Sequence, residues 1–397
     1  MKRKEMDING IKIGGSNPVR IMGIINLSPE SFYQGSIVTS EEQLRSRVET
    51  MEKEGADLID LGGASTAPTK IYGTPETKEK DELERVTSAM QIIGKASKLP
   101  ISIDTTFSKV AEAALDLGAV LVNDVSGLRG DAGMAMTLAD RDVPVVLMAR
   151  CSDGCSSLED SYQALKESIN IAETAGLPLE NIVVDPGIGF GKPPEVDFAI
   201  LKKLNRFSLF RRPLLVGVSR KAFIGHLLEG TGPENRLAGT IAATSVAVAN
   251  GADIIRAHDV PEACIAARIG EALREEPLQD GRVEVLQLLD ENEIKQVLEY
   301  VGVGEAIRKG LAEKGAMMQI LLEDVPVPAA LIIKQEMLAL GGDAAYHYDT
   351  IDHRIERTAV LLMGTKKQLR RMTRKMKTMR YFGLDEIGSQ IQSTLRF

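Results

Sequence analysis

Three polar side chains of this chain have the chemistry to bind a flat heterocycle, and each follows a short apolar segment. They are Asp104, Asn123 and Asp185. Carboxyl and amide groups offer the hydrogen-bond donors and acceptors that a ring with several N–H and C=O groups requires. Phe190 lies in the glycine-rich segment after Asp185 and could stack on such a ring. These residue types therefore predict a planar, polar ligand.

A second set of residues, also placed after apolar segments, suits a diphosphate. Arginine presents a planar fork of donors, lysine a point charge, and asparagine and serine neutral donors. The set consists of Asn26, Ser219, Arg220, Lys221, Arg256 and His258. A heterocycle beside a diphosphate indicates a reaction in which a diphosphate leaving group is displaced.

The segment from residue 182 to 192, I-V-V-D-P-G-I-G-F-G-K, indicates how such side chains are positioned. Its apolar start predicts a short strand that ends on Asp185, and its glycines allow the backbone to approach a ligand. For this segment alone, an aspartate that caps the next helix is the simpler interpretation. The binding interpretation gains weight because the same arrangement recurs along the chain.

Short apolar segments that read as strands alternate with helical segments through most of the chain. Strands are expected at residues 19–25, 57–61, 101–103, 119–122, 143–148, 182–184, 214–218 and 253–255. This alternation predicts parallel strands joined by right-handed crossovers, and eight such units fit a closed (β/α)8 TIM barrel of about 250 residues. An open, doubly wound sheet would usually carry a G-x-G-x-x-G turn after its first strand, and the sequence has none there.

Sites in such barrels lie at the carboxyl ends of the strands. Seven of the eight expected ends carry Asn, Asp, Ser, Arg or His. The fifth end has Ala149 at this position, and its arginine, Arg150, comes only one residue later. Each polar residue taken alone is more simply a turn former. Together they predict one cleft with carboxylates and amides on one side and cations on the other.

The composition is that of a soluble globular protein. Of 397 residues, 44% are hydrophobic, and 56 acidic residues against 48 basic ones give a net charge of −8. This charge argues against nucleic acid as a partner of the whole molecule. No apolar run of about 18 residues is present, so no membrane span is expected.

The three cysteines, Cys151, Cys155 and Cys264, indicate no disulfide framework, and no basic-then-apolar signal segment opens the chain. We therefore expect a reducing, cytoplasmic location. Cys151 and Cys155 could in principle bind a metal, but no second pair or nearby histidine completes a set of four ligands.

The pattern changes near residue 275, so we expect two domains. These are a barrel over residues 1–275, and a helical linker with a small α+β domain over residues 276–397. The last expected helix, over residues 365–378, carries many cations, no acid and a stripe of Leu and Met at spacings of three and four. The simplest interpretation of its cations is a solvated face, and an acidic or phosphate-rich partner is the alternative.

Eight motifs of the barrel region resemble, in order, the motif set of the dihydropteroate synthase family. They are M-G-I-I-N-L-S-P-E-S-F at 22–32, I-D-L-G-G-A-S-T-A-P at 59–68, I-S-I-D-T at 101–105, V-N-D-V-S-G at 122–127, D-P-G-I-G-F-G-K at 185–192, G-V-S-R-K-A-F-I-G at 217–225, R-L-A-G-T at 236–240 and R-A-H-D-V at 256–260. The resemblance implies a TIM barrel that couples 7,8-dihydropterin-6-ylmethyl diphosphate to the amine of p-aminobenzoate and releases diphosphate with the help of Mg²⁺. It also implies a homodimer, since dimers are common in the family.

The same resemblance implies roles for individual residues. It implies that the pterin is bound by Asp104, Asn123, Asp185 and Lys221, and that the diphosphate and metal are bound by Asn26, Arg256 and His258. It implies an arylamine pocket formed by Phe32, Thr66, Pro68, Ser219 and Lys221. Lys221, Asp185 and Asp104 are the expected catalytic residues, and Asn26 is the expected Mg²⁺ ligand.

Four positions depart from the family pattern. Glu30 and Gln34 stand where the first loop usually has aspartates, Ala67 replaces an arginine of the second loop, and Ala149 replaces a histidine. These changes bear on Mg²⁺ binding and on the arylamine. That substrate could be p-aminobenzoate, for folate synthesis, or an extended aminobenzene, for methanopterin synthesis.

Two other functions are compatible with the pterin motifs. A methyltetrahydropterin-binding barrel that passes methyl groups to a corrinoid protein shares the pterin-facing residues but leaves Ser219, Arg220 and Lys221 unexplained. A non-catalytic pterin-binding protein would explain the altered loops. Segments 334–344 and 356–371 also resemble an accessory segment fused to some dihydropteroate synthases, which favours the synthase.

Overall fold

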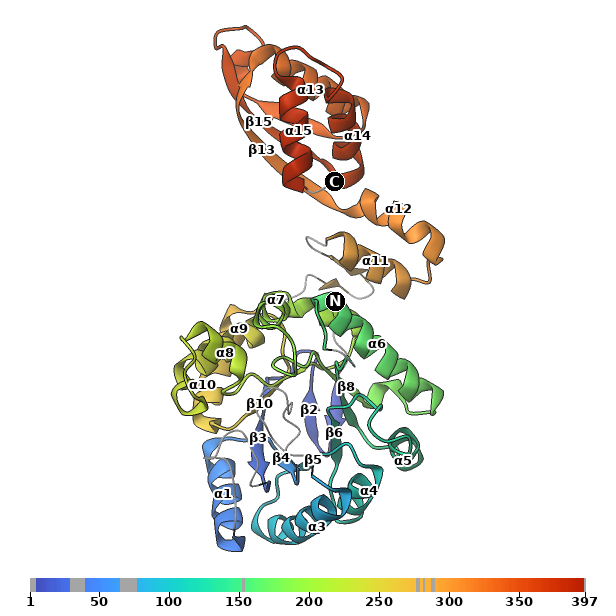
Figure 1. The fold of residues 1–397 in the computed structure, drawn as a ribbon, viewed down its shortest axis with the longest axis vertical. Helices are drawn as coiled ribbons and strands as arrows, with labels where there is room; N and C mark the ends of the chain where they lie inside the picture. Colours follow the sequence, from blue (N-terminus) through green and yellow to red (C-terminus); the bar gives the residue numbers. More distant parts are fainter. Residues whose placement is uncertain are drawn as a thin grey trace. The chain divides into compact units, whose positions relative to one another are not determined.

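Eight parallel strands form the sheet of the first part of the chain (Figure 1). They are β3 (Arg20–Asn26), β4 (Leu58–Gly62), β5 (Ile101–Asp104), β6 (Leu121–Asp124), β7 (Val145–Met148), β8 (Ile182–Asp185), β9 (Leu215–Val216) and β10 (Ile254–Ala257). Neighbours pair in the order β8-β7-β6-β5-β4-β3-β10-β9, and a bridge between Val184 and Leu214 joins the two ends. A helix follows each strand, so the predicted (β/α)8 TIM barrel is confirmed.

The structure, a computed structural model, describes residues 5–28, 40–64, 77–151, 154–275, 279–280, 283–286 and 290–395. The chain divides into two compact units, Met1–Glu284 and Val285–Phe397. The sequence places the boundary at residue 275, and the short antiparallel strands β11 (Gln279–Asp280) and β12 (Val283–Glu284) follow that point within the first unit.

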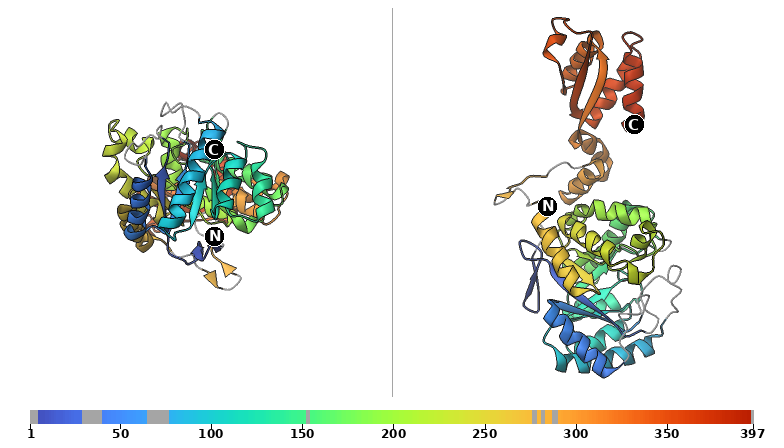
Figure 2. Two further views of the ribbon diagram at one scale, coloured as in Figure 1. Left: turned by 90° about the horizontal axis from the view of Figure 1, so that it is seen from below. Right: turned by 90° about the vertical axis from the view of Figure 1, so that its left-hand side faces the viewer.

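The helices of the first unit surround the strands (Figure 2). They are α1 (Glu41–Glu54), α3 (Glu79–Ala96), α4 (Ser108–Asp116), α5 (Met134–Arg141), α6 (Leu158–Thr174), α7 (Pro194–Lys202), α8 (Ala222–Leu227), α9 (Leu237–Ala249) and α10 (Val260–Leu273). In α1, Leu44, Val48 and Met51 are buried because their spacing of four and three puts them on the face toward the sheet. Ser40 caps the start of α1 by accepting a hydrogen bond from the Gln43 backbone N–H.

An N-terminal hairpin packs against the amino end of the barrel. Its strands β1 (Met6–Ile8) and β2 (Ile11–Ile13) pair antiparallel. Ile8 and Ile13 are buried in one apolar cluster with the first residues of barrel strands, such as Leu58. The barrel is therefore filled at this end, which leaves its carboxyl end to ligands.

The second unit has a three-stranded antiparallel sheet with β15 (Arg357–Thr365) in the centre and β13 (Met317–Pro326) and β14 (Asp343–Tyr346) on either side. Its strands and main helices are α11 (Glu291–Tyr300), α12 (Glu305–Gly315), β13 (Met317–Pro326), α13 (Val327–Ala339), β14 (Asp343–Tyr346), β15 (Arg357–Thr365), α14 (Lys366–Met376) and α15 (Leu384–Leu395). Alternate residues of β15, including Val360 and Leu362, are buried in the core of this unit. The predicted α+β fold is confirmed, with α15 as an additional helix.

The basic helix that the sequence predicts is α14. Its Leu369, Met372 and Met376 are fully buried in the core of the second unit. Three of its cations pair with glutamates of the same unit: Lys366 with Glu291 at 2.7 Å, Arg370 with Glu313 at 2.6 Å and Lys375 with Glu336 at 2.6 Å. This arrangement is that of an amphipathic helix with a charged outer face.

Within the described residues, no helix is both long enough and apolar enough to cross a lipid bilayer.

Candidate active site

The predicted heterocycle-binding residues lie at one end of the barrel. Asp104 ends β5, Asn123 is the third residue of β6 and Asp185 ends β8. Asp104 and Asn123 are direct partners in the register of β5 and β6. All three side chains are buried, and they meet because the carboxyl ends of parallel strands lie at the same end of a barrel.

Arg256 of β10 contacts two carboxylates at this end of the barrel. Its Nε lies 2.6 Å from Asp60 Oδ2, and its Nη2 lies 2.8 Å from Asp104 Oδ2. Asn123 Nδ2 also donates to Asp60 Oδ2, at 3.0 Å. Side chains from β4, β5, β6 and β10 therefore form one hydrogen-bonded network.

Asp60 belongs to this network, although the sequence prediction assigned it no role in binding. It counts among the polar residues at the predicted strand ends, but it lies inside β4 and is fully buried. Its signal in the sequence is an aspartate inside the apolar segment I-D-L. The guanidinium of Arg256 contacts carboxylates beside the predicted heterocycle site. The sequence, in contrast, predicts that Arg256 binds the diphosphate.

Two oxygens of the network have no hydrogen-bond partner among the described residues. They are Asp60 Oδ1 and Asn123 Oδ1, and both are buried. Buried acceptors are nearly always hydrogen-bonded in folded proteins, because an unpaired one costs about 1–3 kcal/mol. This pair of acceptors is therefore suited to N–H donors of a ligand.

The glycine turn after β8 is held by two buried carboxylates. Asp185 Oδ1 accepts from the Gly187 N–H at 2.8 Å, and Asp197 Oδ1 of α7 accepts from the Gly189 N–H at 2.8 Å. Gly187 and Gly189 have φ values of 68° and 77°, in the left-handed region that favours glycine. The glycine-rich sequence is thus required by the backbone of the turn.

Lys221, the residue before α8, contacts the same turn. Its Nζ donates to the Ile188 carbonyl and lies 4.3 Å from the centroid of the Phe190 ring. A Cβ atom at Gly189 would lie 2.5 Å from Lys221 Cδ, so only glycine lets the lysine pass. The structure therefore brings Lys221 and Phe190 together, as a cation above an aromatic face.

Burial shifts the pKa values of the two charged groups that flank this turn. It lowers the pKa of Lys221 to about 8, and the neighbouring carboxylate of Asp185 opposes that shift. Burial also raises the pKa of Asp185, opposed first by Lys221 and then by the Gly187 N–H. Lys221 and Asp185 therefore each favour the charged form of the other against the effect of burial, and such shifted pairs are frequent at binding and catalytic sites.

His258 and Ser219 lie together at the ends of β10 and β9. His258 Nδ1 is 3.0 Å from Ser219 Oγ, which also accepts from the His258 backbone N–H at 3.2 Å. Burial, followed by the nearby Arg256, lowers the pKa of His258 well below its usual value. The imidazole is therefore neutral at pH 7 and has one donor and one acceptor nitrogen.

Arg220, which the sequence assigns to a diphosphate, has partners for its guanidinium within the protein. Its Nε and Nη2 pair with the two oxygens of Asp259, each at 2.8 Å, and its Nη1 donates to the carbonyls of Pro233 and Glu234. The side chain is buried. Arg220 therefore connects three loops of the barrel, a role that sequence reasoning cannot distinguish from anion binding.

Asn26, the expected Mg²⁺ ligand, ends β3 and pairs with Gly62 of β4. The side-chain oxygen of Asn26 is 3.6 Å from the position that a Cβ atom would take at Gly62, which is ordinary van der Waals contact. Among the described residues, no three His, Cys, Asp or Glu side chains are grouped to hold a metal. Asn26 can therefore provide one oxygen ligand, and a substrate would have to provide others.

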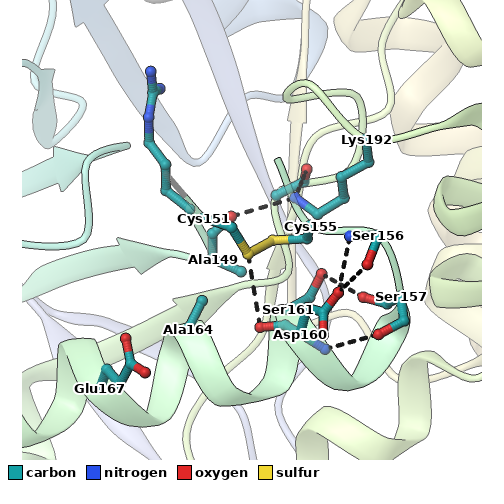
Figure 3. The surroundings of a disulfide bond; sticks show 12 residues. Ala149, Cys151, Cys155, Ser156, Ser157, Asp160, Ser161, Ala164, Glu167 and Lys192 are labelled. Carbon is teal, nitrogen blue, oxygen red and sulfur yellow. Dashed lines mark hydrogen bonds between the residues drawn. A yellow bond between two sulfur atoms is a disulfide. The ribbon is translucent and has the colours of Figure 1, made fainter. Parts of the chain in front are cut away.

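The loop after β7 contains a disulfide bond between Cys151 and Cys155 (Figure 3). This finding corrects the expectation that the cysteines form no disulfide, and a bonded pair offers no thiolates to a metal. Cys151 Sγ also lies 3.8 Å from the Asp160 carbonyl of α6. Disulfides are rare in reducing compartments, so this bond argues against the expected cytoplasmic location, which stays a prediction.

Phe32, Thr66 and Pro68, the residues predicted for the arylamine pocket, lie outside the described residues. The same holds for Glu30, Gln34 and Ala67 of the altered loops. Their roles stay predictions.

The chain is similar to known pterin-binding proteins. Residues 22–258 match the family of pterin binding enzymes. The dihydropteroate synthase of Clostridium beijerinckii is 39% identical over 256 residues, which cover 64% of this chain and 93% of the relative. The dihydropteroate synthase of Bacillus subtilis is 37% identical over 255 residues, which cover 64% and 88%.

Solved structures agree with the sequence relatives. The dihydropteroate synthase of Clostridium difficile, determined in the presence of pteroic acid, superposes with a TM-score of 0.59 at 39% identity and covers 65% of this chain and 97% of its own. The enzyme of Xanthomonas albilineans with 4-aminobenzoic acid gives a TM-score of 0.62 at 35% identity, with 70% and 100% covered.

Proposed function

Because this chain belongs to the dihydropteroate synthase family of pterin-binding enzymes, we propose that the carboxyl end of its barrel joins a 7,8-dihydropterin diphosphate to an arylamine and releases diphosphate. The chain is a transferase of this family. The observation that best supports this location of the pterin site is the pair of buried acceptors, Asp60 Oδ1 and Asn123 Oδ1, beside Asp104.

The pterin ring is proposed to lie between this network and the glycine turn. Its N–H groups donate to Asp60 Oδ1 and Asn123 Oδ1. Further ring groups bind the carboxyl groups of Asp104 and Asp185, and Lys221 Nζ donates to a ring acceptor. Phe190, which already lies against Lys221, provides an apolar face for the ring. This arrangement uses the buried polar groups that would otherwise be costly to keep.

The diphosphate is proposed to bind at the ends of β3, β9 and β10. Asn26, Ser219 and the neutral imidazole of His258 offer donors there without adding charge. Mg²⁺ would be held there by the Asn26 side-chain oxygen together with the diphosphate, since Mg²⁺ often takes few protein ligands beside substrate phosphates. It would supply positive charge beside the leaving group.

In the proposed reaction, the C–O bond between the pterin methylene and the diphosphate breaks, and its electron pair leaves with the diphosphate. The arylamine nitrogen attacks the methylene carbon, forms the C–N bond and then loses a proton to solvent. The carboxylates of Asp60 and Asp104 stabilise the positive charge that develops on the pterin. An aromatic amine is neutral at pH 7, so it needs no general base before attack.

The arylamine is proposed to be p-aminobenzoate, in folate synthesis. The solved structure of the Xanthomonas albilineans enzyme with 4-aminobenzoic acid supports this choice. An extended aminobenzene, as in methanopterin synthesis, is the second candidate because the sequence of the first two loops differs from the family pattern. Comparison of the two amines as substrates decides between them.

A homodimer is proposed to form through α9 and α10. Ile265, Ile269 and Leu273 recur every four residues along α10, and each is at least half exposed. Val246 is an exposed apolar residue of α9, which packs beside α10. A continuous apolar stripe on a packed helix pair suits the same stripe of a second copy, and Ile269→Glu should convert dimer to monomer in light scattering.

The function is tested by diphosphate release from 7,8-dihydropterin-6-ylmethyl diphosphate and p-aminobenzoate with Mg²⁺. The proposal requires stoichiometric release of diphosphate and formation of dihydropteroate. Binding of the pterin without diphosphate release, with either amine, would favour a non-catalytic binding protein. Binding of methyltetrahydropterin in preference to the diphosphate would favour the methyltransferase.

A further inference from the structure

Lys192 is a buried cation that the proposed reaction does not use. It ends the glycine-rich segment after β8, and only 6% of its surface is exposed. Lysine is rarely buried to this extent, because transfer of an ammonium group out of water is costly unless specific partners compensate. The partners of Lys192 therefore indicate what its burial achieves.

The Nζ atom of Lys192 connects the glycine turn to the end of the neighbouring strand. It donates to the Gly187 carbonyl at 2.6 Å. It also donates to the Ala149 carbonyl at 3.3 Å (Figure 3). Ala149 follows β7, and its own N–H donates to the Asp185 carbonyl at 2.8 Å. A single ammonium group thus fixes the start of the turn against β7.

Gly187 is hydrogen-bonded to both Lys192 and Asp185. Its carbonyl is bound by Lys192, and its N–H is bound by Asp185 Oδ1 at 2.8 Å. A Cβ atom at Gly187 would lie 2.6 Å from the Ala149 carbonyl and 2.8 Å from Lys192 Nζ, so only glycine fits between the two. The orientation of the Asp185 carboxyl group is therefore set by a glycine whose position Lys192 holds.

Two carboxylates near Lys192 favour its charged form. Burial lowers the pKa of Lys192 to about 8, and the carboxylates of Asp197 and Asp185 oppose the shift. Asp197 is itself hydrogen-bonded to Gly189 in the same turn. Lys192 therefore compensates two carboxylates, while its hydrogen bonds to Gly187 and Ala149 go to backbone carbonyls rather than to the ligand side.

We propose that Lys192 is a positioning residue for the pterin ring, which holds Gly187 and through it the Asp185 carboxyl group without touching the substrate. The inference rests on the proposed function, since it requires Asp185 to bind the pterin. It predicts that loss of Lys192 weakens recognition of the ring and leaves recognition of the diphosphate unchanged.

The test compares Lys192→Met with Lys202→Met, the same substitution at an exposed lysine of α7. Calorimetry measures the Kd of 6-hydroxymethyl-7,8-dihydropterin and, separately, of inorganic diphosphate with Mg²⁺. For Lys192→Met we expect the pterin Kd to rise about tenfold or more, from the loss of a charge-assisted hydrogen bond, and the diphosphate Kd to stay within about twofold. Lys202→Met should change neither. Equal weakening of both ligands by Lys192→Met, or an unchanged pterin Kd, would overturn the proposal.

Asp185→Asn separates failure of this inference from failure of the proposed function. If Asp185→Asn leaves the pterin Kd unchanged, Asp185 does not bind the ring and the site assignment itself is wrong. If Asp185→Asn weakens the pterin but Lys192→Met does not, only the role of Lys192 is wrong. Should Lys192→Met not fold, Lys192→Gln, which keeps one donor, takes its place, and the same selective rise in the pterin Kd is required of it.

Discussion

The guanidinium of Arg256 lies 2.8 Å from the carboxylate of Asp104, measured from Nη2 to Oδ2. The same guanidinium contacts Asp60 through Nε, so one cation holds two buried carboxylates from different strands. Two carboxylates this close to each other would repel without that cation. Arg256 therefore offsets the repulsion between the carboxylates of Asp60 and Asp104 beside the proposed pterin site.

Replacement of Asp60 by asparagine tests this network. Asp60→Asn removes a fully buried charge that accepts from both Arg256 and Asn123. We expect the free energy of unfolding to fall by about 1–3 kcal/mol and the pterin Kd to rise about tenfold or more. Chemical denaturation and calorimetry measure the two effects. Glu112→Gln, which breaks an exposed ion pair with Arg141, is the control and should change stability by less than about 0.5 kcal/mol.

Lys221 is the cation expected to matter most for turnover. Lys221→Ala removes the donor that lies above Phe190, and we expect kcat/KM to fall at least about hundredfold because a charge-assisted contact to the substrate is lost. Asp185→Asn should have a similar effect. Steady-state kinetics and thermal unfolding measure both variants, with the exposed Lys98→Ala as control. Near-normal turnover in either site variant would show that the residue is misassigned.

The sequence predicted the strands and their ends well, because buried parallel strands are short apolar runs that stop where polar side chains begin. Asp104, Asn123 and Asp185 were found in this way. The partners of these residues could not be found, since they depend on which side chains meet across the barrel. Asp60 and Arg256 are almost two hundred residues apart in sequence and meet only because β4 and β10 both neighbour β3.

Arg220 and the cysteines illustrate the same limit. The motif S-R-K places Arg220 beside Lys221 in sequence, yet the two side chains diverge, one to Asp259 and one to the glycine turn. Arg220 has a φ of 55°, a left-handed conformation that turns the chain between them. A spacing of four residues likewise did not reveal whether Cys151 and Cys155 would bond, because the path of the loop decides it.

The buried Glu82 of α3 gives the protein a pH-dependent stability. Burial raises the pKa of Glu82 from 4.5 to about 7, with the Thr105 hydrogen bond and Arg85 opposing the shift and Glu79 adding to it. The folded protein thus binds this proton more tightly than the unfolded chain, so its contribution to stability is lost as pH rises from about 4.5 to 7.

Glu82→Gln removes this titration. Relative to the unmodified protein, we expect the variant to gain on the order of 3 kcal/mol of unfolding free energy between pH 4.5 and pH 8. Denaturant titrations at the two pH values measure the change. Glu84→Gln, at an exposed position of the same helix, should show no such difference. An equal effect of Glu82→Gln at both pH values would mean that Glu82 does not titrate in this range.

The disulfide of the loop after β7 should stabilise the barrel. A closed loop with a sequence separation of 4 restricts the unfolded chain by about 2 kcal/mol in the loop-entropy description. The double variant Cys151→Ser/Cys155→Ser should lower the unfolding free energy by about that amount under oxidising conditions, and dithiothreitol should have the same effect on the unmodified protein. Cys264→Ser, at the free cysteine, is the control. No response to dithiothreitol, with free-thiol titration showing three thiols, would mean that the bond does not form in solution.

The last prediction concerns the arylamine and rests on Ala67, which stands where the family pattern has arginine and lies outside the described residues. An arginine contact to an anionic group contributes about 1.5–3 kcal/mol, so its absence should weaken a bound anion about ten- to hundredfold unless another cation replaces it. Lys70, three residues later, is the candidate replacement. We expect p-aminobenzoate to have a high KM and Ala67→Arg to lower that KM or to tighten diphosphate binding. Steady-state kinetics of the unmodified enzyme and of Ala67→Arg, each with and without Lys70→Ala, measure this. If the unmodified enzyme has a micromolar KM that Ala67→Arg leaves unchanged, and Lys70→Ala has no effect, the missing arginine has no bearing on the choice of substrate.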